Sequence, residues 1–74
     1  MIINPDIESQ YTARIDEASA TITYVGHADP GSVEGDAVWR IKKIDSSGVL
    51  KILFADGDKE FNNIWTDRAS LTYS

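Results

Sequence analysis

Residues 36–61 constrain the fold of this chain most, because they read as three consecutive antiparallel strands joined by two turns, DAVWRIKKIDSSGVLKILFADGDKEF. Successive side chains of a strand point to opposite faces, so Trp39 and Ile41 should share one face of the first strand. Turn-forming residues follow at 45–48. The sequence therefore predicts a β-meander at the centre of the fold.

The second strand of this stretch, residues 49–54, alternates as well. Leu50, Ile52 and Phe54 fall on one side, and they alternate with Val49, Lys51 and Leu53. This mixture predicts a strand with one fully buried face and one partly covered face.

An Asp-Gly pair at residues 56–57 ends that strand. The pair is typical of a type I′ turn, in which both central residues take positive φ. We therefore expect a second hairpin here, with Phe54 and Phe61 opposite each other or one register apart.

The remaining segments also favour short strands. Residues 11–16 and 20–26 alternate and predict a first hairpin, with Ile22 and Tyr24 on one face. Residues 62–65 continue or break a strand, 66–68 read as a turn, and 69–73 read as a final strand. No stretch is convincingly helical. The prediction is a single all-β domain over residues 1–74, a small antiparallel barrel or sandwich of about five to six short strands, with a loosely held segment at 1–9.

Length and composition limit how such a domain is stabilised and what it binds. Its 74 residues include no cysteine, which excludes disulfides and thiolate metal sites. A domain this small buries little surface, so oligomerisation or docking on a partner is the remaining source of additional stability. The formal net charge of −5 argues against binding to nucleic acid or to an anionic membrane. No apolar run has the length of a membrane span, and no signal peptide is visible, so we expect synthesis in a cytoplasm.

The longest irregular stretch, residues 27–35, predicts an exposed loop, and loops of this length often carry function. The only histidine, His27, should be a solvated loop residue, because Ser32 beside it is a weak nucleophile and no second catalytic cluster supports the pair. We therefore expect no enzyme activity. The candidate contact residues of this loop are His27, Asp29, Pro30, Ser32 and Glu34.

A run of acidic residues between Asp56 and Asp67 superficially resembles a calcium loop. Phe61 stands where an EF-hand needs glycine, and Asp67 stands where it needs a bidentate glutamate. The hairpin turn explains the Asp-Gly pair better, so we expect no metal and no cofactor.

The two tryptophans allow two interpretations. Trp39 and Trp65 either fill the core of a small domain that has few large residues, or anchor a contact surface, where Trp, Tyr and Arg concentrate. The candidate framework or interface residues are Trp39, Arg40, Trp65, Arg68 and Tyr73. Basic side chains also gather on neighbouring predicted strands and form either a solvated face or a patch that pairs with an acidic neighbour in a symmetric assembly; they are Arg40, Lys42, Lys43 and Lys51.

Four segments carry a resemblance to a known family. They are YVGHADPGS at 24–32, AVWRIKKI at 37–44, FADGDKEFNNIW at 54–65 and DRASLTY at 67–73. Their order and composition resemble a family of small tailed-bacteriophage proteins. The resemblance covers about residues 22–74 and leaves residues 1–10 outside it.

The resemblance implies a phage protein, made in the cytoplasm of a bacterial host. The expected function is a non-enzymatic structural or accessory role in the virion, as a component of the capsid, neck, tail or baseplate. Its partners would be other virion proteins or further copies of itself, contacted through residues 26–36 and the termini. The alternative is a host-directed or regulatory protein-binding module, such as a small SH3-like domain.

Overall fold

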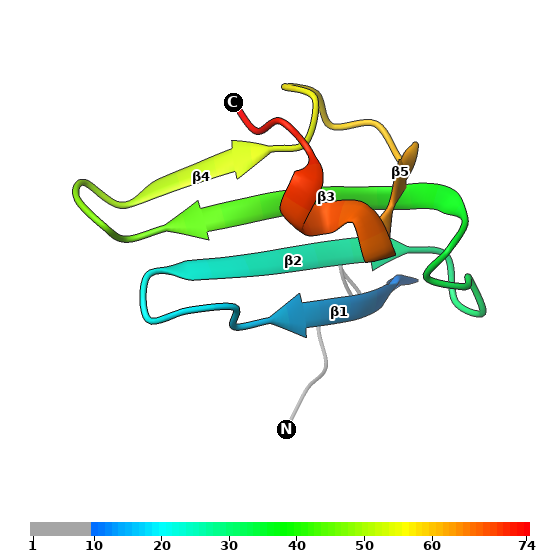
Figure 1. The fold of residues 1–74 in the computed structure, drawn as a ribbon. Helices are drawn as coiled ribbons and strands as arrows, with labels where there is room; N and C mark the ends of the chain where they lie inside the picture. Colours follow the sequence, from blue (N-terminus) through cyan, green and yellow to red (C-terminus); the bar gives the residue numbers. More distant parts are fainter. Residues whose placement is uncertain (1–9) are drawn as a thin grey trace.

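A computed structural model of the chain describes residues 10–74, which form five β-strands and one short 3₁₀ helix (Figure 1). The elements are β1 (Thr12–Asp16), β2 (Ile22–Ala28), β3 (Ala37–Asp45), β4 (Lys51–Phe54), β5 (Asn63–Ile64) and η2 (Trp65–Ser70). All strand pairs are antiparallel, which confirms the predicted all-β class, but the sheet is open and does not close into a barrel. The predictions for residues 1–9 lie outside the described residues.

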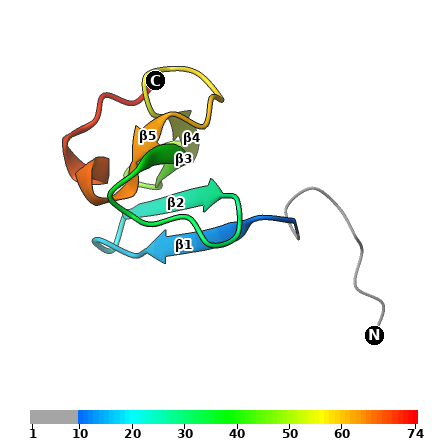
Figure 2. The same ribbon diagram turned by 90° about the vertical axis from the view of Figure 1, so that its right-hand side faces the viewer.

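Strands β1 to β4 form a meander in which each strand pairs with the next. The first hairpin is confirmed, with Thr12 opposite Ala28 and Asp16 opposite Tyr24. Strand β3 is the longest, at nine residues, and it occupies the centre of the sheet. One edge of β3 pairs with β2, and the other edge pairs with β4 near Asp45 and with β5 near Ala37 (Figure 2).

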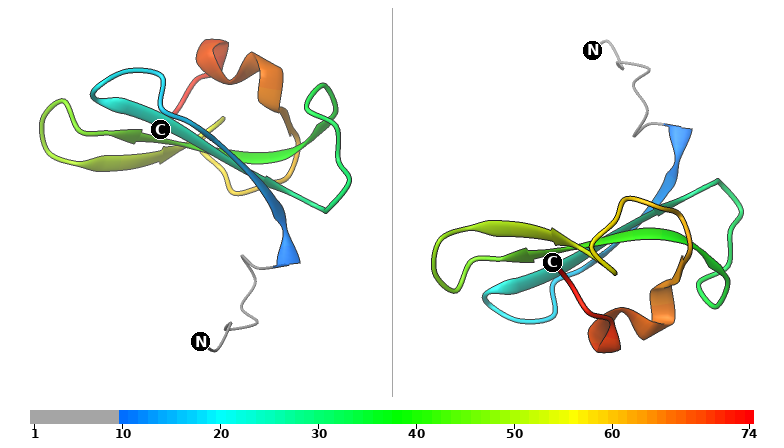
Figure 3. Two further views of the ribbon diagram at one scale, coloured as in Figure 1. Left: turned by 90° about the horizontal axis from the view of Figure 1, so that it is seen from below. Right: turned by 90° about the horizontal axis from the view of Figure 1, so that it is seen from above.

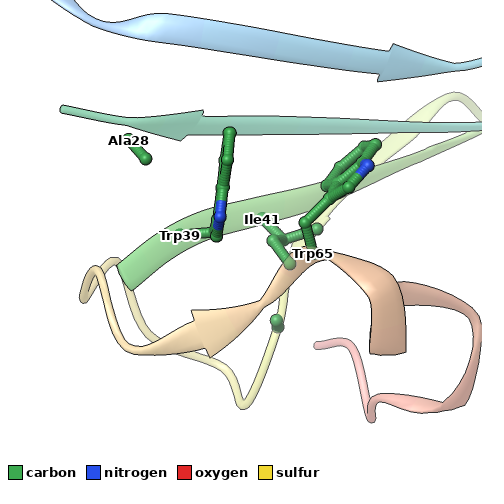
Figure 4. Close-up of a cluster of buried hydrophobic side chains, with 5 residues drawn as sticks. Ala28, Trp39, Ile41 and Trp65 are labelled. Carbon is green, nitrogen blue, oxygen red and sulfur yellow. The ribbon is translucent and has the colours of Figure 1, made fainter. Parts of the chain in front are cut away.

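One face of the sheet, which we call the inner face, carries the core. Trp39 and Ile41 from β3 meet Ala28 from β2 and Trp65 from η2, and all four are buried (Figure 4). The two indole rings lie with their centroids 6.0 Å apart. Helix η2 covers this face, as the edge-on views of Figure 3 show. The prediction that Trp39 and Ile41 share one face of their strand is confirmed.

The C-terminal residues pair with the end of β4. Phe54 N–H donates to the carbonyl of Ser74 at 3.0 Å, and Ser74 N–H donates back to the carbonyl of Phe54 at 3.1 Å. Ala55 and Tyr73 form an antiparallel bridge immediately beside this pair.

The predicted hairpin of Phe54 with Phe61 is wrong for this reason. The Asp-Gly turn does form, with φ of 59° at Asp56 and 70° at Gly57, as a type I′ turn requires. The edge of β4 with which residues after the turn would have to pair is already occupied by the C-terminal residues. Residues 58–62 therefore leave the sheet edge and cross to the face opposite η2, and within residues 10–74 Phe61 pairs with no strand.

Residues 65–70 form a 3₁₀ helix where the sequence predicted a turn and the start of a final strand. Side chains bond to the helix's own carbonyls, which favours the tight winding: Ser70 Oγ donates to Asp67 O at 2.9 Å, and Arg68 Nη1 donates to Trp65 O at 3.1 Å. Winding this segment also places Trp65 over the sheet. Burial of that indole outweighs the weak strand preference of the segment.

Candidate contact face

The face of the sheet opposite the core, which we call the outer face, is the candidate functional surface. Strand register places its residues in rows across the sheet, because directly opposed residues lie on the same side. One row runs from Ile15 through Val25 and Lys42 to Phe54, and the next contains Thr23, Ile44 and Ile52. Four strands thus contribute aliphatic and aromatic side chains to one surface.

The half of the outer face next to the turns at 17–21 and 46–50 is covered by no other segment of residues 10–74. Ile15 is 69% exposed and Ile52 is 54% exposed, and Leu50, directly before β4, is also exposed. The predicted fully buried face of residues 49–54 is therefore wrong. Figure 3 shows the physical reason: residues 58–62 cross the other half of this face, and the turns at 17–21 and 46–50 project beyond them.

The other half of the outer face is lined with aromatic rings. Tyr11 stacks on Phe61 with ring centroids 5.2 Å apart, and the guanidinium of Arg40 lies 5.1 Å from the centroid of Phe61. A pocket of about 300 Å³ lies beside them and is lined by Tyr11, Asp29, Val38 and Phe61. Sequence reasoning missed Tyr11 and Phe61 as members of this face, because no local pattern brings residues 50 positions apart together.

His27 lies in β2 and is buried, so the prediction of a solvated loop histidine is wrong. Pairing of β1 with β2 continues to Ala28, which extends the strand through His27. The ring of Tyr11 meets its imidazole edge-on at 6.4 Å between centroids. His27 is thus a packed residue of the outer face and does not belong to the candidate contact loop.

The other candidate loop residues follow β2 in an ordered turn. Ser32 donates to the carbonyl of Asp29 from both its N–H, at 3.1 Å, and its Oγ, at 2.7 Å. Pro30 sits between them in the turn. Glu34 Oε2 accepts from Arg14 Nε at 2.7 Å, and Trp39 Nε1 donates to the carbonyl of Val33 at 3.0 Å. These bonds tie the loop to β1 and to the core.

The candidate framework residues separate into two groups. Trp39, Trp65, Arg68 and Tyr73 belong to the inner face, where Arg68 Nε donates to Asp16 Oδ2 at 2.9 Å and Tyr73 Oη donates to Arg68 O at 2.8 Å. Arg40 lies on the outer face over Phe61. The structure therefore places both tryptophans in the core and supports the first of their two interpretations.

The basic side chains likewise do not form one patch. Arg40 and Lys42 alternate with Lys43 along β3, so they point to the outer face while Lys43 points to the inner face, 5.1 Å from the ring centroid of Tyr73. Lys51 stands opposite Asp45 across the β3–β4 ladder. Lys42 is thus the basic residue at the centre of the aliphatic rows.

Among residues 10–74, the pKa values of Tyr73 and Asp45 are shifted from their ordinary values, and both residues lie away from the outer face. Burial, helped by the neighbouring Tyr24, raises the pKa of Tyr73 to about 12. Hydrogen bonds from the hydroxyl and then the N–H of Ser47 lower the pKa of Asp45.

Within residues 10–74, no three histidine, cysteine or acidic side chains gather as ligands for a metal ion. In the same described part of the chain, no helix has the length and hydrophobicity needed to cross a membrane. Comparison of the chain with protein-family models, with curated proteins and with solved structures finds no match.

Proposed function

We propose that this chain is a non-enzymatic structural or accessory protein of a tailed-bacteriophage particle, and that it acts through protein–protein contacts made by its outer face. The observation that carries the proposal is the exposure of Ile15 and Ile52 on one side of an ordered sheet, with Leu50 exposed directly before β4. Exposed apolar surface of this kind marks interaction sites, because its burial against a partner removes it from water and is favourable.

The resemblance of residues 22–74 to small tailed-phage proteins supports the virion as the setting. A small domain without disulfides gains stability when it docks on a larger assembly. The acidic remainder of the surface keeps the free protein soluble, since a net charge of −5 opposes self-association elsewhere on the chain.

The test is mass spectrometry of purified particles from cells that carry the wild-type or a substituted chain. The informative variant carries Ile15→Thr and Ile52→Thr, which remove exposed apolar surface and keep two β-branched strand residues. We expect the wild type in the particles and at least a tenfold loss of the double variant. A wild-type chain absent from purified particles would contradict the proposal.

A matched variant distinguishes the outer face from the loop at 29–36. Val33 is exposed in that loop, so Val33→Thr removes an equivalent apolar side chain outside the outer face. We expect Val33→Thr to leave incorporation unchanged. If Val33→Thr abolishes incorporation and the double variant does not, the loop is the contact. If the wild-type chain is absent from particles and is recovered on one host protein from lysate, the host-directed function replaces the virion role.

A further inference from the structure

The outer edge of β1 is the second feature of the sheet that is open to a partner. Strand β1 pairs with β2 on one side, and no strand of the described chain pairs with its other side (Figure 1). An edge strand presents a row of N–H and C=O groups that another strand can pair with.

The backbone hydrogen bonds of the sheet establish which groups of β1 point outward. Ser46 N–H donates to the carbonyl of Thr21 at 2.9 Å, so Thr21 directs its backbone toward β3, and Val25, four residues later, does the same. Ile15 stands opposite Val25 and therefore directs its N–H and C=O away from β2. Ala13 has the same orientation, and its outward carbonyl accepts from Arg14 Nη1 at 3.1 Å.

We propose that a second copy of this chain pairs with this edge, β1 against β1, around a two-fold axis at Ile15. The inference rests on the proposed role in protein–protein contacts and identifies one partner. In this register Ile15 exchanges both backbone hydrogen bonds with Ile15 of the other copy, and the two sheets join into one continuous sheet. The exposed Ile15 side chains then meet on the outer face, next to Val25 of each copy.

Charge complementarity favours this register over the adjacent one. Pairing around Ile15 places Arg14 of one copy opposite Asp16 of the other, twice by symmetry. Pairing around Arg14 would place two arginines directly opposite each other, and like charges in that position are destabilising. Arg14 has five N–H donors and Asp16 two carboxylate oxygens, so each can add this contact to its internal bonds with Glu34 and Arg68.

A proline substitution on β1, with a matched control on β4, tests pairing at the β1 edge. Ile15→Pro removes an outward N–H and leaves the β1–β2 ladder intact, since proline is tolerated on edge strands whose N–H faces solvent. Ile52→Pro is the control, because Ile52 shares the outward orientation of Phe54 on the opposite edge of the sheet. Light scattering across a dilution series should give a dimer for wild type and Ile52→Pro, and a monomer for Ile15→Pro.

Charge substitutions at the axis test the register and do not depend on proline. Ile15→Lys and Ile15→Glu each place a charge opposite itself, so each should raise the dimer dissociation constant at least tenfold. Mixing the two variants should restore a heterodimer, detected by native mass spectrometry. The same substitutions at Ile52 should leave dimerisation unchanged.

A wild-type chain that stays monomeric at the highest concentration, or a dimer that survives Ile15→Pro and Ile15→Lys, would overturn the inference. These outcomes are distinguishable from failure of the proposed function. A monomeric chain found in purified particles refutes the β1 pairing and leaves the virion role standing. A dimer with the expected variant behaviour that is absent from particles does the reverse.

Discussion

Gly26 and Trp65 are in direct contact across the core. A Cβ atom placed on Gly26 would come within 2.6 Å of Cε3 of the Trp65 indole and 3.2 Å of Cε3 of Trp39. Glycine normally weakens a strand interior, and here its missing side chain lets two indole rings pack against the backbone of β2. The packing of the core thus depends on the absence of a side chain at one position.

Gly26→Ala should therefore destabilise the fold by about 1–3 kcal/mol, the usual cost of overpacking a core. Gly48→Ala is the matched control, because a Cβ there meets no atom within 4 Å. Urea denaturation followed by tryptophan fluorescence measures both. Equal free energies of unfolding for the two variants would contradict this packing of Trp65 and Trp39 against Gly26.

The ion pair of Arg68 with Asp16 connects η2 to β1, which lies 52 residues earlier in the sequence, at 2.9 Å. The guanidinium also lies 4.5 Å from the ring centroid of Trp65. Because both side chains are partly exposed, a double-mutant cycle with Arg68→Ala and Asp16→Asn should give a coupling energy of only ~0.5–1 kcal/mol.

Arg68→Lys discriminates between charge and shape at this position. Lysine keeps the charge and loses the planar group that stacks on Trp65 and donates to its carbonyl. We expect Arg68→Lys to recover less than half of the stability lost in Arg68→Ala. Full recovery would show that charge alone matters there.

Alternation along the strands predicted much of this fold. Trp39 and Ile41 share the inner face, the first hairpin pairs as expected, and the Asp-Gly turn has both positive φ angles. These features depend on local backbone geometry and on a period of two, which a sequence displays directly.

The errors arise where distant segments compete for the same partner. The sequence around Phe61 cannot reveal that Ser74 occupies the edge of β4, or that Phe61 then stacks on Tyr11. The exposure of the outer face was missed for the same reason. Alternation predicts on which face of its strand Ile15 or Ile52 lies, but whether that face is buried depends on whether another segment covers it.

Tyr73 should make stability decline at alkaline pH. Its pKa is raised to about 12 in the folded chain, against about 10 in an unfolded one. Below pH ~10 both states hold the proton, so the stabilisation is fully present; between pH ~10 and ~12 the unfolded state loses its proton first, and the free energy of unfolding falls.

Tyr73→Phe tests this assignment. The variant loses the hydrogen bond to the Arg68 carbonyl, about 1 kcal/mol at neutral pH, and should lose most of the decline above pH ~10. Denaturation at pH 8 and pH 11 measures both effects. An unchanged alkaline decline in Tyr73→Phe would assign it to another group.

Asp45 begins the turn between β3 and β4, and Ser47 stabilises its ionised form. Ser47 Oγ donates to Asp45 Oδ1 at 2.6 Å and Ser47 N–H donates to the same oxygen at 2.9 Å, so the pKa of Asp45 lies below 3.8. A lowered pKa contributes stability above the unfolded value, and this contribution is lost as the pH falls through the folded value.

Ser47→Ala should raise the pKa of Asp45 toward its ordinary value and leave it below that value, because the backbone N–H of Ser47 remains. Ser46→Ala is the matched control, since Ser46 Oγ donates to the carbonyl of Thr21 at 3.4 Å instead. Titration of the Asp45 carboxyl carbon by NMR measures both variants. A pKa that does not move in Ser47→Ala, or moves equally in Ser46→Ala, would refute the hydroxyl as the main cause.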